Sequence, residues 1–271
     1  MRHAIRSVVL TGALVILLAV PAGVANADAT TWKAEHDTDP HLPLTPEQLH
    51  MTAAKRAAES QIDAAFPPAD PFSTCGISCG GGGLPSSASL AANQTPQTTS
   101  YYCGPAAVHE ALDAMGVWLP QSSAAAALHT TTGGTAWSGG GTSPSGYPVP
   151  DVLNRYQSRN YYVPQAVSSA TSSAISTYES DLRTDIASVK APLVADAWEV
   201  PGGYHLDGHP GNEQIFHWFE IRGYQSSGAS TMYEDSVHGA TSVSWSGYVP
   251  AYSTMASSKI VSIVSGRGYV W

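Results

Sequence analysis

The sequence predicts an α+β domain in which helices come first along the chain and strands follow. Helical patterns with small or apolar faces occupy the middle of the chain, whereas short runs of alternating apolar and polar residues, bounded by Gly, Ser or Pro, occupy the last third. A run of helices followed by a run of strands is typical of segregated helical and sheet layers. With 271 residues, 43% of them hydrophobic, the chain is long enough to bury a sizeable core.

The charge balance argues against nucleic acid as a partner. The formal net charge is −9 at pH 7, with 12 Lys and Arg residues against 21 Asp and Glu residues. Binding to phosphates requires clustered Lys and Arg side chains, and this chain carries few of them. Three cysteines are too few for a disulfide-stabilised miniprotein or a four-cysteine zinc site.

The first 27 residues have the features of a signal peptide. A basic start precedes an apolar run over residues 7–20, which ends at Pro21, and residues 25–27 have the small-x-small form that signal peptidase recognises. The run is short for a membrane span, which needs about 20 residues. We therefore expect a secreted, extracellular protein that begins near Asp28 and has no stable membrane insertion after signal cleavage.

Residues 28–93 are predicted to form an N-terminal helix and a linker rather than a domain. Thr45, Pro46 and Gln48 favour a helix start, because threonine caps the helix, proline fits its first turn and glutamine completes a capping box. The pattern runs to Phe66, and its apolar face consists mostly of small residues, so we expect it to pack weakly. A stretch rich in Gly and Ser follows. The alternative is a pro-segment that occupies the substrate groove and is removed.

The predicted domain covers residues 94–271 and begins with helices. Cys103 and Pro105 open an apolar helical pattern that stops at Gly116, with the proline in the first turn. Further helical patterns cover residues 122–129, 148–156 and 177–189, and a loop rich in Thr and Gly covers residues 130–146. Strands are predicted over residues 191–198, 214–224, 231–235, 240–245 and 260–264.

The positions of the cysteines single out one thiol. In an oxidising compartment an odd cysteine is free, paired between chains or chemically employed. Cys75 and Cys79 lie close together in a Gly-rich stretch and are expected to form a disulfide, which leaves Cys103 alone. Cys103 stands at a helix start, where unsatisfied backbone N–H groups and the helix dipole favour a thiolate. This position suits a nucleophile, and a buried structural thiol is the alternative.

A thiolate nucleophile needs a base and a group that orients the base. His217 lies in a strand pattern rich in aromatic and β-branched residues, where alternation places it on one face with Ile215 and Phe219. The next strand pattern ends at Asp235, so antiparallel pairing of the two strands would bring Asp235 beside His217. The alternatives are a core histidine and a turn aspartate.

The string over residues 97–106, QTTSYYCGPA, resembles the nucleophile motif of the double-glycine-type, bacteriocin-processing cysteine peptidases, and in particular their free-standing secreted relatives with a papain-like fold. Gln97 stands six residues before Cys103, as in that family. The blocks around His217 and Asp235 follow in the family's order and spacing. The resemblance covers about residues 94–264 and implies an N-terminal catalytic helix packed on a mainly antiparallel sheet.

Carried onto this sequence, the resemblance makes Cys103 the nucleophile and His217 the general base and later the acid. Asp235 would orient the imidazole, and Gln97 would donate to the oxyanion beside the Cys103 backbone N–H. The resemblance thus implies a cysteine peptidase that hydrolyses amide bonds of a peptide or protein substrate through an acyl-enzyme. The alternatives are a catalytically idle papain-like module that binds peptide or cell-wall material, and an acyl transferase with the same centre.

A second polar cluster contains residue types that bind metals. Its members are His205, Asp207, His209 and Glu213. Neighbouring glycines and Pro210 favour a loop, and the spacing matches no zinc motif. We therefore interpret the cluster as a polar loop near the active site, and we interpret Glu199, just before it, as a solvent-exposed strand end. No metal or other cofactor is expected.

Overall fold

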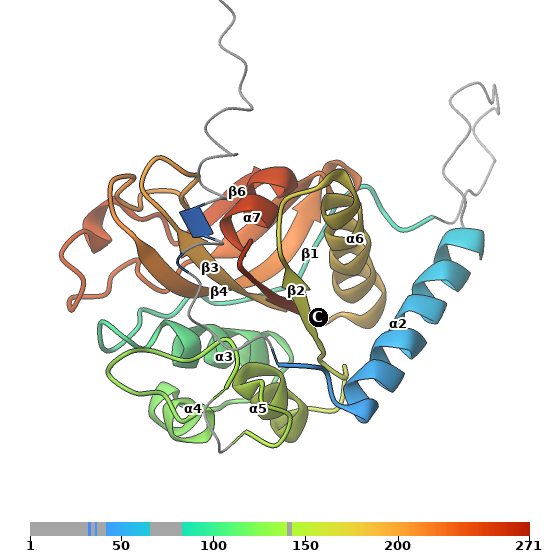
Figure 1. The fold of residues 1–271 in the computed structure, drawn as a ribbon, viewed down its shortest axis with the longest axis horizontal. Coiled ribbons are helices and arrows are strands. Elements are labelled where there is room, and N and C mark those ends of the chain that lie inside the picture. The colour runs from blue at the N-terminus through green and yellow to red at the C-terminus, as the bar shows by residue number, and fades with distance from the viewer. Residues whose placement is uncertain (1–31, 34–35, 37–41, 66–82, 140–142) are drawn as a thin grey trace, which may run out of the picture.

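The computed structural model describes residues 32–33, 36, 42–65, 83–139 and 143–271. The predicted signal peptide at residues 1–27 and the predicted disulfide between Cys75 and Cys79 lie outside these described residues. Figure 1 shows an antiparallel sheet between two groups of helices. The prediction of an α+β fold is therefore confirmed.

The strands form one antiparallel sheet. Its order is β2-β7-β3-β4-β5-β6, and the short strand β1 pairs with β4. The strands are β1 (Ala88–Ser89), β2 (Pro164–Val167), β3 (Leu193–Glu199), β4 (Ile215–Gln225), β5 (Ser230–Glu234), β6 (Tyr252–Ala256) and β7 (Arg267–Val270). Strands β3 and β4 pair along the whole of β3, so that Glu199 lies opposite Ile215. Strand β1 precedes residue 94, so the sheet includes a part of the chain that the sequence assigned to a linker.

Helices cover both faces of the sheet (Figure 1). They are α3 (Cys103–Ala114), α4 (Gln121–Leu128), α5 (Pro148–Tyr156), α6 (Ser172–Arg183) with a π-helical extension (Thr184–Val189), and α7 (Ser257–Ile263). One apolar cluster joins α3, α4 and α5 to Val194 and Trp218 of the sheet. A second cluster joins α6 and α7 to Ala195 and Phe219, the next residues along β3 and β4. The period of two along a strand therefore supplies a core on each face.

Two predicted strands are wrong. Residues 260–264 belong mostly to helix α7, in which Ile260, Val261 and Ile263 are buried. A short apolar run fits a buried strand and a buried helix equally well, and here the packing against α6 decides for the helix. Residues 240–245 form turns rather than a strand, because β6 at residues 252–256 takes the position beside β5.

Helix α2 (Pro46–Ala65) packs against the domain through charged side chains (Figure 1). The ammonium group of Lys55 lies 3.2 Å from Asp185, and the guanidinium of Arg56 pairs with Asp181; both of these carboxylates are fully buried. Lys55 and Arg56 also lie over the ring of Trp271, at 4.4 and 4.1 Å from its centroid. The helix is therefore held on the domain by charged side chains rather than by its small apolar face, which packs weakly, as predicted.

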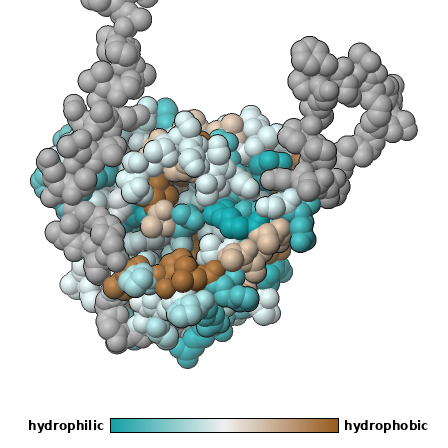
Figure 2. All heavy atoms as spheres, turned by 45° about the vertical axis from the view of Figure 1, so that its right-hand side comes forward, coloured by the Kyte–Doolittle hydropathy of each residue, from teal (hydrophilic) through white to brown (hydrophobic). Residues whose placement is uncertain are grey.

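Figure 2 shows one face of the molecule, and the surface on this face is mostly polar. A hydrophobic patch lies in the lower half of the view. Among the described residues, no helix combines the length and apolar character that crossing a membrane requires. The apolar residues of the described chain are instead concentrated in the two clusters that flank the sheet.

Candidate active site

Cys103 is the first residue of α3, and residues 103–112 of this helix are all buried. The thiol is therefore held at a helix N-terminus, where the free N–H groups and the dipole favour negative charge. Gly104 lets a neighbouring loop approach this end of the helix, because a Cβ atom at position 104 would lie 2.3 Å from Oγ1 of Thr135. The backbone carbonyl of Thr135 accepts a 2.9 Å hydrogen bond from the indole of Trp218 on β4. Helix, loop and sheet thus fix the position of Cys103 together.

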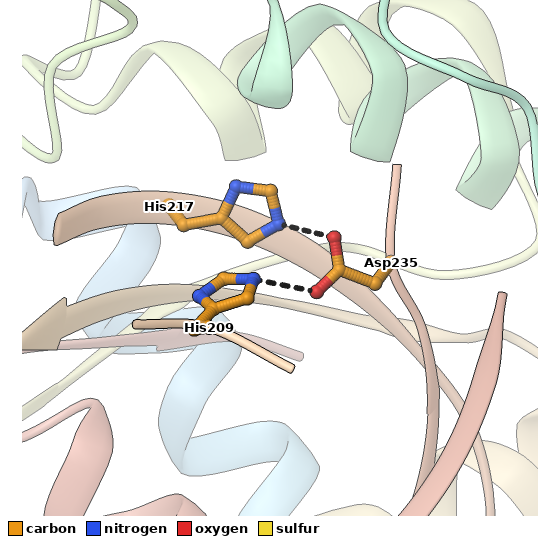
Figure 3. A group of neighbouring side chains, drawn as sticks. All are labelled: His209, His217 and Asp235. Carbon is orange, nitrogen blue, oxygen red and sulfur yellow. Dashed lines mark hydrogen bonds and ion pairs between the residues drawn. The ribbon is translucent and has the colours of Figure 1, made fainter. Parts of the chain in front are cut away.

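His217 lies on β4 between Cys103 and Asp235. Its Nε2 atom is 3.1 Å from Oδ1 of Asp235, and its imidazole also interacts with the thiol of Cys103. Figure 3 shows the second ring nitrogen directed away from the carboxylate. Burial by itself would lower the pKa of His217, but Asp235 and Cys103 outweigh it and raise this pKa well above its usual value. The imidazole is therefore held in its charged form.

Asp235 directly follows β5, as the predicted pairing of the two strands requires. Glu234 lies opposite Glu220 of β4, which places the next residue, Asp235, near the end of β4 that carries His217. The Oδ1 atom of Asp235 also accepts a 2.9 Å hydrogen bond from the backbone N–H of Val237. Burial would raise the pKa of Asp235, but two imidazoles beside it hold this pKa far below its usual range. The carboxylate is therefore ionised.

Gln97 lies in the same cavity as Cys103, with its amide held in one orientation. Its Oε1 atom accepts a 3.2 Å hydrogen bond from the hydroxyl of Ser236, and its Nε2 atom donates a 2.8 Å hydrogen bond to the carbonyl of Thr99. An amide nitrogen has two hydrogens, so one remains for a ligand. The backbone N–H of Gln97 donates to the carbonyl of Ser236, which ties this segment to the residue after Asp235. All four residues predicted for the site therefore lie together.

Two cavities flank Cys103, with volumes of about 270 and 320 Å³. The first is lined on the Gln97 side by His217 and the turn that contains Trp245. The second lies beside the loop at residues 131–137 and the side chain of Trp218, and Cys103 and Phe216 line both cavities. All lining residues come from position 97 onward, so helix α2 contributes to neither cavity. A substrate chain that crossed the thiol would find room on both sides.

The structure separates the polar cluster that the sequence suggested. Both ring nitrogens of His205 face backbone carbonyl oxygens, those of Gly203 and Glu213, at 3.2 and 3.1 Å. His209 instead points into the site. The turn between them depends on Gly208, which has a φ of +84° and whose Cβ, if present, would lie 2.3 Å from the carbonyl oxygen of Tyr248.

Glu199 and His209 are site residues whose role the sequence does not indicate. The interpretation of Glu199 as a solvent-exposed strand end is wrong, because its side chain is fully buried and its Oε2 atom lies 2.9 Å from Nδ1 of His209. The Nε2 atom of His209 lies 2.9 Å from Oδ2 of Asp235 (Figure 3). The spacing of these residues carries no signal, since a strand end and a loop meet only in the folded chain.

Ligand atoms of His209, His217 and Asp235 lie within 4.8 Å of one another, close enough for a metal ion. The contacts between the side chains already account for this proximity, because each imidazole presents its Nε2 atom to one oxygen of Asp235. We therefore assign no metal to this group.

Three glutamates are buried behind the site, one each from α3, β4 and β5. Glu110, Glu220 and Glu234 are all fully inaccessible to solvent. Within the described chain, the carboxyl oxygens of Glu220 and Glu234 have no hydrogen-bond partner. Burial, together with repulsion from its acidic neighbours, raises the pKa of Glu220 well above its usual value, and burial raises the pKa of Glu234 to about 7. These carboxyl groups are therefore protonated in weakly acidic solution.

We expect the stability of the domain to fall as the pH rises from about 5 to 9. Glutamates of the unfolded chain ionise near pH 4.3, whereas Glu220 and Glu234 hold their protons to higher pH in the folded domain. Their stabilising contribution is complete below the unfolded pKa and is lost as the pH rises through the folded values. Glu220→Gln should therefore raise the Tm by several degrees at pH 8–9 and change it little at pH 5, as measured in thermal scans.

The matched control for this prediction is Glu213→Gln, at an exposed position in a loop. This change removes one carboxylate charge from a solvent-exposed side chain, so the Tm of the variant should follow that of the wild type across the pH range. Parallel Tm profiles for Glu220→Gln and the wild type would contradict the prediction.

The fold and the site together define a class. An α+β domain in which a cysteine at the start of a buried helix contacts a histidine, itself paired with an aspartate, is typical of cysteine-peptidase-like proteins. The chain belongs to the Peptidase_C39 like family, whose model matches residues 90–260. No curated protein matches the sequence. The resemblance drawn from residues 97–106 is thereby confirmed at the level of the family, which indicates a cysteine-peptidase-like function and a peptide or protein substrate.

Proposed function

We propose that the protein is a secreted cysteine peptidase that hydrolyses amide bonds of a peptide or protein substrate through an acyl-enzyme on Cys103. The observation that carries this proposal is the buried line of contacts from Cys103 through His217 to Asp235, which lies between two cavities. Secretion rests on the signal-peptide features of residues 1–27. The position of Cys103 at the start of the buried helix α3, beside an antiparallel sheet, supports a papain-like arrangement in which α3 is the catalytic helix.

In the first half of the reaction, the Cys103 thiolate attacks the carbonyl carbon of the substrate. The carbonyl electrons move to the oxygen, and the Cys103 backbone N–H and the free N–H of Gln97 donate to the oxyanion that forms. The imidazolium of His217 then gives its proton to the leaving amine as the C–N bond breaks. The products of this step are a free amine and a thioester on Cys103.

In the second half, the neutral imidazole of His217 takes a proton from water, and the resulting hydroxide adds to the thioester. The collapse of this second tetrahedral intermediate releases a carboxylic acid and restores the thiolate beside the imidazolium. Asp235 holds the same ring orientation throughout, because its Oδ1 atom faces Nε2 of His217. An amine in place of water would give acyl transfer from the same thioester, so the chemistry of the product separates the two activities.

The test of the proposal is the reactivity of Cys103 toward iodoacetamide. An ordinary thiol, with a pKa of about 8.5, reacts slowly below pH 7, whereas a thiolate paired with an imidazolium reacts there readily. We expect mass spectrometry of the Cys103 peptide to show alkylation at pH 5–6 in the wild type. His217→Ala should abolish this reactivity at low pH, and the matched variant His50→Ala, at an exposed position on α2, should retain it.

Alkylation of the wild type that follows an ordinary thiol titration would contradict the proposal. It would favour the catalytically idle module, in which Cys103 needs no activation. The hydrolysis experiment described in the Discussion then distinguishes an activated thiol that turns substrate over from one that does not.

A further inference from the structure

The Asp235 carboxylate is held on its far side by a second buried pair of side chains. Figure 3 shows His209 and His217 on the two oxygens of Asp235, with His209 Nε2 at 2.9 Å from Oδ2. The other nitrogen of His209 lies 2.9 Å from Oε2 of Glu199. The remaining oxygen of Glu199 accepts a 2.8 Å hydrogen bond from the backbone N–H of Leu206. The side chains of His209 and Glu199 are fully shielded from solvent.

The geometry sets the protonation state of His209. Ionised carboxylates only accept hydrogen bonds, and each ring nitrogen of His209 faces one of their oxygens. Both nitrogens must therefore carry hydrogen, which makes the ring an imidazolium. The charges then alternate in sign from Glu199 through His209 and Asp235 to His217, an arrangement that compensates the cost of burying them.

The surroundings of His209 contain few other ionisable groups. Glu199 comes from β3, His217 from β4, with its ring centroid 5.2 Å away, and Asp235 from the end of β5. The ring of Trp245 covers His209 with its centroid at 4.6 Å. Beyond these groups, the ammonium of Lys33 interacts with Glu199, and the carboxyl group of Glu110 interacts with Asp235 and His217.

We propose that His209, held by Glu199, is a positioning residue that fixes the Asp235 carboxylate and shares its negative charge with His217. This inference rests on the proposed cysteine peptidase function. Oδ1 of Asp235 faces His217 and accepts the N–H of Val237, while Oδ2 faces His209, so the carboxylate is held at both oxygens and cannot rotate. The fixed carboxylate in turn keeps the imidazole of His217 oriented toward Cys103.

The charge of His209 has a second consequence, which is electrostatic. A cation on the far oxygen of Asp235 offsets part of the attraction between Asp235 and the imidazolium of His217. The removal of that cation leaves the whole carboxylate charge for His217 and stabilises its protonated form. The pH at which His217 loses its proton should therefore rise, and a residue that served only to stabilise the fold would not produce this change.

The test uses the full-length protein and two variants that remove a charge and keep a similar shape. His209→Gln keeps an N–H group that can donate to Asp235, and Glu199→Gln keeps an acceptor for the N–H of Leu206. The readout is the rate of alkylation of Cys103 by iodoacetamide between pH 4 and 10, measured on its peptide. In the wild type the lower inflection reports thiolate formation and the upper one reports the loss of the proton from His217.

We expect His209→Gln to move the upper inflection to higher pH by about 2 units, as the loss of a charge at this distance implies for an effective dielectric constant of about 20. Glu199→Gln should shift it in the same direction by less, because it removes the counterion that keeps His209 charged. Hydrolysis of a peptide substrate should fall about tenfold in His209→Gln, comparable to the loss of a group that orients a functional histidine. The matched control is His205→Gln in the same loop, whose ring faces only carbonyls and which should change neither quantity.

An upper inflection at the wild-type pH in both variants, shown to be folded by circular dichroism, would overturn the positioning role. If His209→Gln does not fold, Glu199→Gln alone decides by the same inflection. A failure of the proposed function looks different, because it appears in the wild type as the loss of low-pH alkylation before any variant is compared.

Discussion

Cys103→Ala is expected to abolish the hydrolysis of every substrate that the wild-type protein cleaves, and His217→Ala is expected to do the same. The thiolate forms the covalent bond to the acyl group, and the imidazole supplies both proton transfers, so neither step proceeds without its residue. Because such residues act as a unit, each single change should lower kcat by about 10⁶-fold. The measurement is the turnover of a fluorogenic peptide library, with circular dichroism to show that the variants are folded.

Two matched variants separate a chemical role from a structural one. Ser100→Ala changes an exposed side chain that lines the same cavity, and His109→Gln changes a buried histidine of α3 whose ring contacts the backbone carbonyl of Leu119. Both should keep activity within a few-fold of the wild type. Full activity in Cys103→Ala would show that the nucleophile is another group.

Gln97→Ala is expected to lower kcat by about 10²–10³-fold and to leave the alkylation of Cys103 unchanged. The free N–H of Gln97 has a partner only when negative charge develops on the substrate oxygen, so its removal affects acyl transfer. Alkylation by iodoacetamide forms no oxyanion and depends only on the thiolate. The measurement is kcat and KM for a peptide substrate, together with the alkylation rate at pH 6.

Two further variants test whether the amide donor is the relevant part of Gln97. Gln97→Glu keeps the oxygen that accepts the Ser236 hydroxyl but replaces the donor by a carboxylate oxygen, so it should be at least as inactive as Gln97→Ala. Ser236→Ala removes that hydroxyl and leaves the donor in place, so it should cost little activity. A parallel loss of alkylation in Gln97→Ala would indicate that Gln97 supports the fold of the site instead of the oxyanion.

The local sequence pattern predicts the central strand β4 correctly, because its residues carry a clear strand signal. Aromatic and β-branched residues alternate through residues 214–224, and the structure has β4 at Ile215–Gln225. The same reasoning fails at residues 260–264, where a short apolar run of similar composition forms a helix. It also misses β2 and β7, since the four residues of each strand offer too few alternations to recognise.

The packing of helix α2 shows a second limit of the local pattern. Its small apolar residues predict weak apolar packing, and the helix is held instead by Lys55 and Arg56. These two side chains pair with Asp185 and Asp181 and lie over the ring of Trp271. From the sequence alone, a charged side chain on a helix is predicted to be solvent-exposed, because the group that it pairs with is not known. These partners lie on α6 and its π-helical extension and at the C-terminus, far away along the chain.

By itself, the sequence determined the α+β class, the family, and which four residues were candidates for the site. The structure brings these four residues together. Cys103 and Gln97 share one short motif, and antiparallel pairing of two adjacent strands suffices to place Asp235 beside His217. Only the tertiary structure decided which groups hold the second carboxylate oxygen of Asp235, the one that does not face His217. Glu199 ends a strand, His209 follows a glycine turn, and their burial beside Asp235 depends on long-range packing. A buried ion pair is a property of two distant positions at once, so no pattern within either segment reveals it.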